Sequence, residues 1–225
     1  MHDLQQEKKL VLEYFNSINN ANSDTLIEII SKYTSSNFKM RCTHPFNELS
    51  GAEEIANNLW IPIKDSFKPI QRRMDIFYAG INSLDNNEGK WVTSMGHLMG
   101  VFKKSFFGIQ PNYKSILLRY AEFYKVENNK ITEGAIFLDI MNFMQQLGLP
   151  VIPESTGLVC VTPGPMNHRG LKYEHSNDDE SQKTLELIHR MRDRLVKGSN
   201  MKSYKDELTL DWHDDMIWWG PGGIG

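Results

Sequence analysis

The sequence contains few cysteines and no long apolar run. Two cysteines, Cys42 and Cys160, stand among 225 residues. This is too few for a disulfide framework, and their spacing does not fit a zinc site. No stretch approaches the roughly 18 to 20 apolar residues that a membrane-spanning helix requires, and the charged N-terminal stretch is not typical of a secretory signal peptide. These absences predict a cytoplasmic protein with no membrane partner.

An excess of charge of one sign is also lacking. Lys and Arg number 25 and Asp and Glu number 28, so the formal net charge is -3. Basic residues occur as isolated pairs such as Lys8–Lys9 and Arg72–Arg73 rather than as stripes, and we therefore expect no nucleic-acid partner. The 16 Gly and 9 Pro are close to average usage, and the 40% of hydrophobic residues can form a core. Collagen-like and disordered classes are thus excluded.

Apolar periodicity divides the first 148 residues into helices, strands and a closing helix. The predicted helices, with apolar residues at helical spacing, cover 10–18, 25–33, 51–61 and 140–147. The predicted strands, in which apolar and polar residues alternate, cover 38–43, 71–81, 90–106, 114–126 and 130–138. Pro62 is expected to end the third helix. Gly96 and Gly100 favour a bend in the long fourth strand, as in a curved sheet that encloses something. This order predicts an α+β fold.

Four segments, in order, resemble the SnoaL-like polyketide cyclase family. They are GHLMGVF (96–102), FGIQP (107–111), LRYAEFYKVENNKI (118–131) and LDIMNFMQQLG (138–148). Members of that family have a GH-containing strand, a GIP-type turn, an RxxEF-type strand with a GKI turn, and a D-x4–6-QxG pattern at the final helix. The resemblance extends over about residues 8–148. It implies a nuclear transport factor 2-like cone, in which N-terminal helices pack on a curved antiparallel sheet around a pocket.

The resemblance also suggests a domain organisation, because one branch of the family carries two such domains in tandem. Met40–Pro45 and Met216–Pro221 both open on Met and reach Pro five positions later, and each follows an amphipathic helix. We therefore expect a cone domain over 1–148, a proline-rich connector over 149–177, and the start of a second, incomplete SnoaL-like domain over 178–225.

Asp139 and His97 are the candidate catalytic residues. Asp139 lies among apolar neighbours where the last strand meets the closing helix, so burial is expected to raise its pKa toward the range of a general acid/base. The resemblance implies that this Asp moves the proton in ring closure, whereas the alternative is that it only caps the helix. His97 matches the GH position and could polarise a carbonyl or hold an enolate oxygen; the alternative is a core histidine.

Five further side chains are candidate substrate contacts: Glu122, Tyr120, Trp60, Trp91 and Phe137. Arg119 and Glu122 have opposite parity on one strand, so at most one of them faces the pocket, and Glu122 shares its face with Tyr120 and Tyr124. An exposed charge or a sheet-end ion pair is the alternative for Glu122, and core packing is the alternative for the aromatic residues.

No metal and no cofactor are expected. Residues 220–225 spell GxGxxG, but no helix follows them. His213–Asp215 have metal-ligand side chains without ligand spacing. The resemblance implies an intramolecular aldol-type ring closure of a small hydrophobic carbonyl substrate by acid/base catalysis alone. The alternative function is a non-catalytic module of the same cone, which binds a small molecule or forms a homodimer.

Overall fold

A computed structural model describes residues 4–82, 89–151, 164–197, 203–216 and 220–221. The helices are α1 (Gln5–Asn20), α2 (Leu26–Tyr33), α3 (Gly51–Ile55), α4 (Ile61–Ser66), α5 (Ile140–Gln146), α6 (Asp178–Lys197) and α7 (Tyr204–Asp211). The strands are β1 (Thr34–Cys42), β2 (Glu48–Ser50), β3 (Gln71–Asn82), β4 (Gly89–Val101), β5 (Ser115–Glu127) and β6 (Lys130–Leu138). The predicted α+β order is confirmed.

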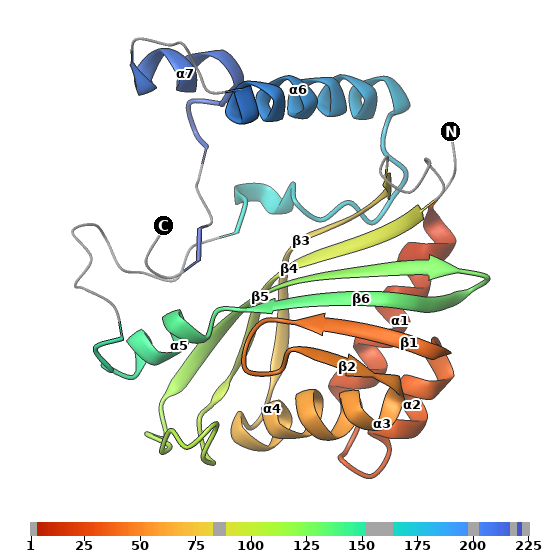
Figure 1. The fold of residues 1–225 in the computed structure, drawn as a ribbon, viewed down its shortest axis with the longest axis vertical. Coiled ribbons are helices and arrows are strands. Elements are labelled where there is room, and N and C mark those ends of the chain that lie inside the picture. Colours follow the sequence, from red (N-terminus) through yellow and green to blue (C-terminus); the bar gives the residue numbers. More distant parts are fainter. Residues whose placement is uncertain (1–3, 83–88, 152–163, 198–202, 217–219, 222–225) are drawn as a thin grey trace.

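The six strands form one sheet in the order β2-β1-β6-β5-β4-β3. β1 runs parallel to β6, and the other neighbouring strands are antiparallel. Figure 1 shows the long strands curving past one another, with α1–α4 gathered on one side of the sheet and α6 and α7 at the other end of the view. The sheet therefore has an inner side, which faces α1–α4, and an outer side, which faces away from them.

Alternation along β4 and β5 separates these two sides. Val92 and Leu98 of β4, and Leu118 and Tyr124 of β5, are buried in the core. Because successive strand residues point to opposite sides, the even-numbered residues of β4 and β5 face inward and the odd-numbered residues face outward. Tyr14 of α1 packs edge-on against the ring of Tyr124 at 5.6 Å between ring centroids. The inner side is thus closed by apolar and aromatic side chains of α1.

Two of the boundaries that differ from the prediction have a clear physical reason. Pro62 does not end the third helix, because α3 continues through a π-helical turn (Ala56–Trp60) directly into α4, where Pro62 occupies the first turn. Proline lacks the N–H of an α-helical hydrogen bond, and the first turn of a helix tolerates that loss. β4 ends at Val101 instead of 106, since the Lys103 N–H donates to the Ser66 carbonyl at 2.7 Å and leaves the sheet.

The described part of the connector lies along the edge of the sheet. Leu171 forms a parallel bridge with Phe77 of β3. The Lys8 ammonium of α1 donates to the carbonyls of Lys172 and Glu174 at 2.9 and 2.8 Å. Residues 152–163, in the middle of the predicted connector, are outside the described residues.

The predicted amphipathic helix over 178–197 is present as α6, but its apolar residues are not packed inward. Leu185, Ile188 and Leu195 are 44%, 48% and 58% exposed. Part of the predicted strand Met216–Pro221 lies outside the described residues, so the tandem arrangement stays a prediction. Within the described ranges, none of the helices combines the length and apolar character needed to cross a membrane.

Candidate functional site

His97 and Asp139 lie on the outer side of the sheet and are joined by Arg119. Arg119 of β5 is the register partner of His97 of β4. The Asp139 N–H donates to the Arg119 carbonyl at 3.0 Å, and Asp139 Oδ2 lies 3.5 Å from Arg119 Nη2. The three side chains are 4%, 8% and 12% exposed for His97, Asp139 and Arg119. We call Asp75, His97, Arg119 and Asp139 the outer polar row.

Asp75 joins this row through a β-bulge. The register of β3 against β4 shifts between Met74 and Ile76, so Asp75 has no register partner. An extra residue of this kind re-aims a side chain, and here Asp75 Oδ2 lies 3.2 Å from His97 Nδ1. Asp75 Oδ1 lies 3.6 Å from Arg73 Nε. The bulge thus builds an Asp–His pair that the strand pattern does not indicate.

The electrostatics of His97 favour a neutral imidazole. Burial lowers its pKa, the Asp75 carboxylate opposes that shift, and the positive charges of Arg119 and Arg73 add to it. In the tautomer that satisfies Asp75, Nδ1 carries the hydrogen and donates to the carboxylate, which leaves Nε2 as the basic nitrogen. An imidazole oriented in this way by a carboxylate is suited to proton transfer.

Asp139 caps α5. Its Oδ1 accepts a hydrogen bond from the Asn142 N–H at 2.9 Å, which is the usual contact of an Asp at a helix N-cap. The other oxygen, Oδ2, faces Arg119. The capping contact engages one oxygen of the carboxylate and fixes the orientation of the other toward the row.

A second polar group lies on the inner side. Arg72 Nη1 donates to Glu122 Oε2 at 2.8 Å, and the two side chains are 1% and 0% exposed. The guanidinium carbon lies 4.3, 4.8 and 5.5 Å from the ring centroids of Phe15, Tyr120 and Trp60. The parity argument is therefore confirmed, because Glu122 faces inward and Arg119 faces outward. An aromatic box surrounds the ion pair.

Several buried polar atoms around this pair make no hydrogen bond of normal geometry to another described residue. They are Arg72 Nε and Nη2, Glu122 Oε1, Tyr14 Oη, Tyr124 Oη and Trp60 Nε1. Burial raises the pKa of Glu122, and Arg72 opposes that shift. Burial and the nearby Glu122 both raise the pKa of the Tyr14 phenol. Because all but one of these atoms belong to groups that carry a hydrogen, the interior offers donors in excess of acceptors.

The predicted site residues are therefore divided between two sides of the sheet. Glu122, Tyr120 and Trp60 lie on the inner side, and the Tyr120 hydroxyl is 3.0 Å from Ser94 Oγ. Trp91 is half-buried on the His97 side of β4, and Phe137 is 54% exposed on β6.

Two important residues were missed by the sequence reasoning. The first is Arg72, which the sequence could have indicated, because one of two adjacent arginines in a strand must face inward. The second is Asp75, whose position depends on a bulge that the sequence pattern does not reveal.

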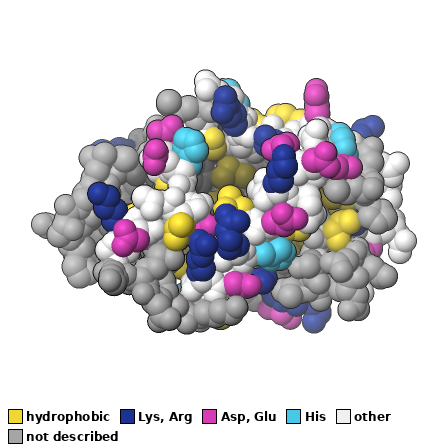
Figure 2. Space-filling model, turned by 90° about the horizontal axis from the view of Figure 1, so that it is seen from above, with side chains coloured by type: hydrophobic (Ala, Val, Ile, Leu, Met, Phe, Trp, Pro, Cys, Tyr) yellow, Lys and Arg dark blue, Asp and Glu magenta, His cyan; other side chains and the backbone are white. Residues whose placement is uncertain are grey.

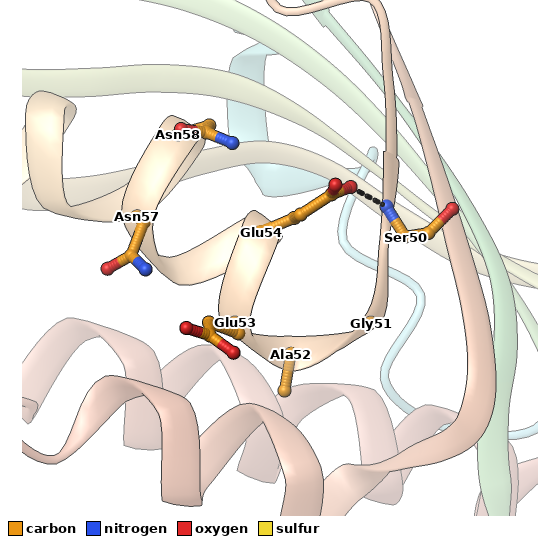
Figure 3. A pocket seen from close by; sticks show the side chains of 7 residues that line it. All are labelled: Ser50, Gly51, Ala52, Glu53, Glu54, Asn57 and Asn58. Atoms are coloured by element: carbon orange, nitrogen blue, oxygen red, sulfur yellow. Dashed lines mark hydrogen bonds between the residues drawn. The ribbon is translucent and has the colours of Figure 1, made fainter.

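A separate pocket of about 440 Å³ lies where β2 meets α3. Figure 3 shows the side chains that line it: Ser50, Gly51, Ala52, Glu53, Glu54, Asn57 and Asn58. Glu54 Oε2 accepts a hydrogen bond from the Ser50 N–H at 2.7 Å. The pocket is polar and contains none of the predicted site residues.

The face of the molecule seen from above carries charges of both signs. In Figure 2, Lys and Arg side chains are interspersed with Asp and Glu on the face seen from above. Among the described residues, no group of three or more His, Cys, Asp or Glu side chains is placed to hold a metal ion.

Residues 86–147 match the sequence model of the family described as SnoaL-like polyketide cyclase. No curated protein matches the sequence. AclR from Streptomyces galilaeus, a candidate hydroxylase, is 20% identical with a TM-score of 0.52, covering 66% of this chain and 85% of its own. A candidate SnoaL-like polyketide cyclase from a Jannaschia species is 17% identical with a TM-score of 0.51, covering 64% and 93%.

A third similar structure is IdmH from Streptomyces antibioticus, a candidate polyketide cyclase. It is 11% identical with a TM-score of 0.50, and the match covers 63% of this chain and 97% of that one. At such identities the similarity concerns the fold. The predicted α+β cone, in which helices pack on a curved sheet, is confirmed.

Proposed function

Because residues 86–147 match the sequence model of the SnoaL-like polyketide cyclase family, we propose that the protein catalyses an intramolecular aldol-type ring closure without a cofactor. The substrate class is a small hydrophobic compound with two carbonyl groups. The observation that supports this proposal most directly is the outer polar row. Asp139, at the N-terminus of α5, contacts Arg119 at the centre of that row, and His97 of β4 is the register partner of Arg119.

Each member of the row has a chemical task in this reaction. Asp139 takes a proton from the carbon next to one carbonyl, and the resulting enolate attacks the second carbonyl to form the new carbon–carbon bond. The guanidinium of Arg119 stabilises the negative charge that develops on oxygen. The alkoxide product then takes up that proton from the Asp139 carboxyl, either directly or through His97, which accepts the proton from Asp139 and passes it on. Protons balance, and the protein returns to its starting state.

Asp75 orients His97 for this task. With Nδ1 donating to Asp75, the imidazole accepts a proton at Nε2 and donates it from the same atom. This refines the expected role of His97, since the neutral ring in this tautomer is a base and only the imidazolium is a donor at Nε2.

The test is Asp139→Asn in the full chain, assayed with an enolisable diketone or polyketide ester. Asn is also a good N-cap, so the variant preserves α5 while it removes the base. We expect turnover to fall by about 100-fold or more. Asp65→Asn, which changes a partly exposed carboxylate on α4, is the matched control. Unchanged turnover in Asp139→Asn would exclude Asp139 as the acid/base, whereas a wild-type protein that binds such compounds without turnover would favour the binding module.

A further inference from the structure

The connector segment, residues 164–175, presses on the bulge that carries Asp75. A Cβ atom added at Gly164 would lie 2.5 Å from Asp75 Oδ1, and one added at Gly170 would lie 2.5 Å from the Asp75 carbonyl oxygen. Neither distance is tolerated by non-bonded atoms. The two glycines therefore allow the backbone of the segment to approach both the side chain and the main chain of Asp75.

The segment is fixed at this place from both sides. The Phe77 N–H donates to the Gly170 carbonyl at 2.8 Å, and the Lys172 N–H donates to the Phe77 carbonyl at 2.7 Å. The Lys8 ammonium holds the carbonyls of Lys172 and Glu174. β3 and α1 thus both anchor the connector, with the Asp75 bulge close to the anchored stretch.

A second contact of the C-terminal part of the chain reaches the same row. Arg119 Nη1 donates to the Gly220 carbonyl at 2.6 Å. The backbone of residues beyond the cone domain consequently touches two of the four members of the outer polar row, Asp75 and Arg119.

We propose that the connector segment is a positioning element of the outer polar row, which holds the Asp75 carboxylate against His97 and keeps water away from the pair. Gly164 and Gly170 are its positioning residues. Any effect of the segment on catalysis rests on the proposed function. Its effect on His97, which it exerts through the Asp75 carboxylate, does not. Among the residues that the structure describes, the charged groups that act on His97 are Asp75 and Arg73 of β3 and Arg119 of β5.

The proposal predicts opposite effects for two variants of the full chain. In Gly164→Ala the added methyl group meets the carboxylate itself and displaces it. The imidazolium then loses its counter-charge, and the pKa of His97 falls by about half a pH unit or more. In Lys8→Met the segment loses its Lys8 contacts with α1 and water reaches the pair, so the pKa of His97 rises toward its ordinary value.

The readout is the titration of the His97 ring by NMR, with the resonance assigned by its loss in His97→Gln. Gly80→Ala is the matched control, because Gly80 also lies in β3 and an added Cβ would meet nothing within 4 Å. In an Asp75→Asn background, Gly164→Ala should cause no further shift, since the carboxylate it displaces is absent.

Unchanged titration of His97 in both Gly164→Ala and Lys8→Met would overturn the proposal. A rise in Gly164→Ala would overturn it too, because it would mean that the segment moved and Asp75 did not. Titration does not require turnover, so inactivity of the protein toward every cyclase substrate would count against the proposed function and leave this inference standing.

Discussion

Arg72 and Glu122 form an ion pair on the inner side of the sheet, with 2.8 Å between Nη1 and Oε2 and neither side chain more than 1% exposed. Removing two charges from water is costly, and their attraction recovers that cost only in good geometry. The aromatic rings around the guanidinium supply part of the compensation, because the faces of Phe15 and Tyr120 attract a cation. Each of the two buried charges is therefore stabilised only while its partner is present.

Loss of one partner of this pair should therefore destabilise the protein more than loss of both. We expect Glu122→Gln to lower the free energy of unfolding by about 3 kcal/mol, since it leaves Arg72 buried and unpaired. The double variant Arg72→Met with Glu122→Leu should recover much of that loss. Urea denaturation measures all three proteins. Asp65→Asn, at partly exposed ion pairs with Lys68 and Lys104, should cost less than about 1 kcal/mol. A Glu122→Gln protein as stable as this control would contradict the prediction.

Burial of His97 should make part of the stability depend on pH. Its pKa in the folded state lies below the unfolded value of 6.5, first because of burial. The contribution of His97 to the free energy of unfolding is complete above pH 6.5. It is lost as the pH falls from 6.5 through the pKa of His97 in the folded state, because the unfolded chain binds the proton first.

The stability difference between the wild type and His97→Gln should accordingly shrink between pH 7.5 and 5. Denaturation curves at several pH values test this. His213→Gln removes an exposed histidine and should leave the slope unchanged. A difference independent of pH would argue against a neutral buried imidazole.

Cys42 should be unreactive in the folded protein. Burial and the nearby Glu122 carboxylate raise the pKa of its thiol to about 12, and only the thiolate reacts with alkylating reagents. In a Cys160→Ser variant, alkylation by iodoacetamide at pH 8 should be about 100-fold slower than in the urea-unfolded chain. Equal rates in the two states would show that the thiol is not held in this environment.

Gly100→Ala should weaken the contact between β4 and the residues that follow α4. A Cβ at this position would lie 2.9 Å from Phe67 Cβ and 3.0 Å from the Pro69 carbonyl oxygen, and neither atom can rotate away. We expect a loss of about 1–3 kcal/mol in the free energy of unfolding. Thermal or urea denaturation alongside Gly80→Ala provides the comparison. A Gly100→Ala protein no less stable than Gly80→Ala would contradict this packing.

The order of elements and the parity within each strand could be predicted from the sequence. Strand 71–81 corresponds to β3 (Gln71–Asn82), and the inward side of β5 follows from the alternation around Glu122. These features are local, because a period of two residues depends on the strand alone. The cone itself followed from the resemblance of four ordered segments.

The site could not be predicted in the same way, because it depends on register between strands. The Asp75 carboxylate contacts His97 only because a bulge shifts the register of β3 against β4. Parity places His97 and Trp91 on one side of β4, but it does not tell which side faces α1. Residues expected around one pocket, such as Glu122 and Asp139, therefore lie on opposite sides of the sheet.

The pairing of Leu171 with Phe77 has a consequence for the assembly of the chain. β3 is a long edge strand of the sheet. An edge strand exposes main-chain groups that can pair with another molecule. The residues that cover it are synthesised after every strand of the sheet. A nascent or truncated chain that ends before Gly170 would present β3 uncovered, and such chains should be the ones that associate through this strand.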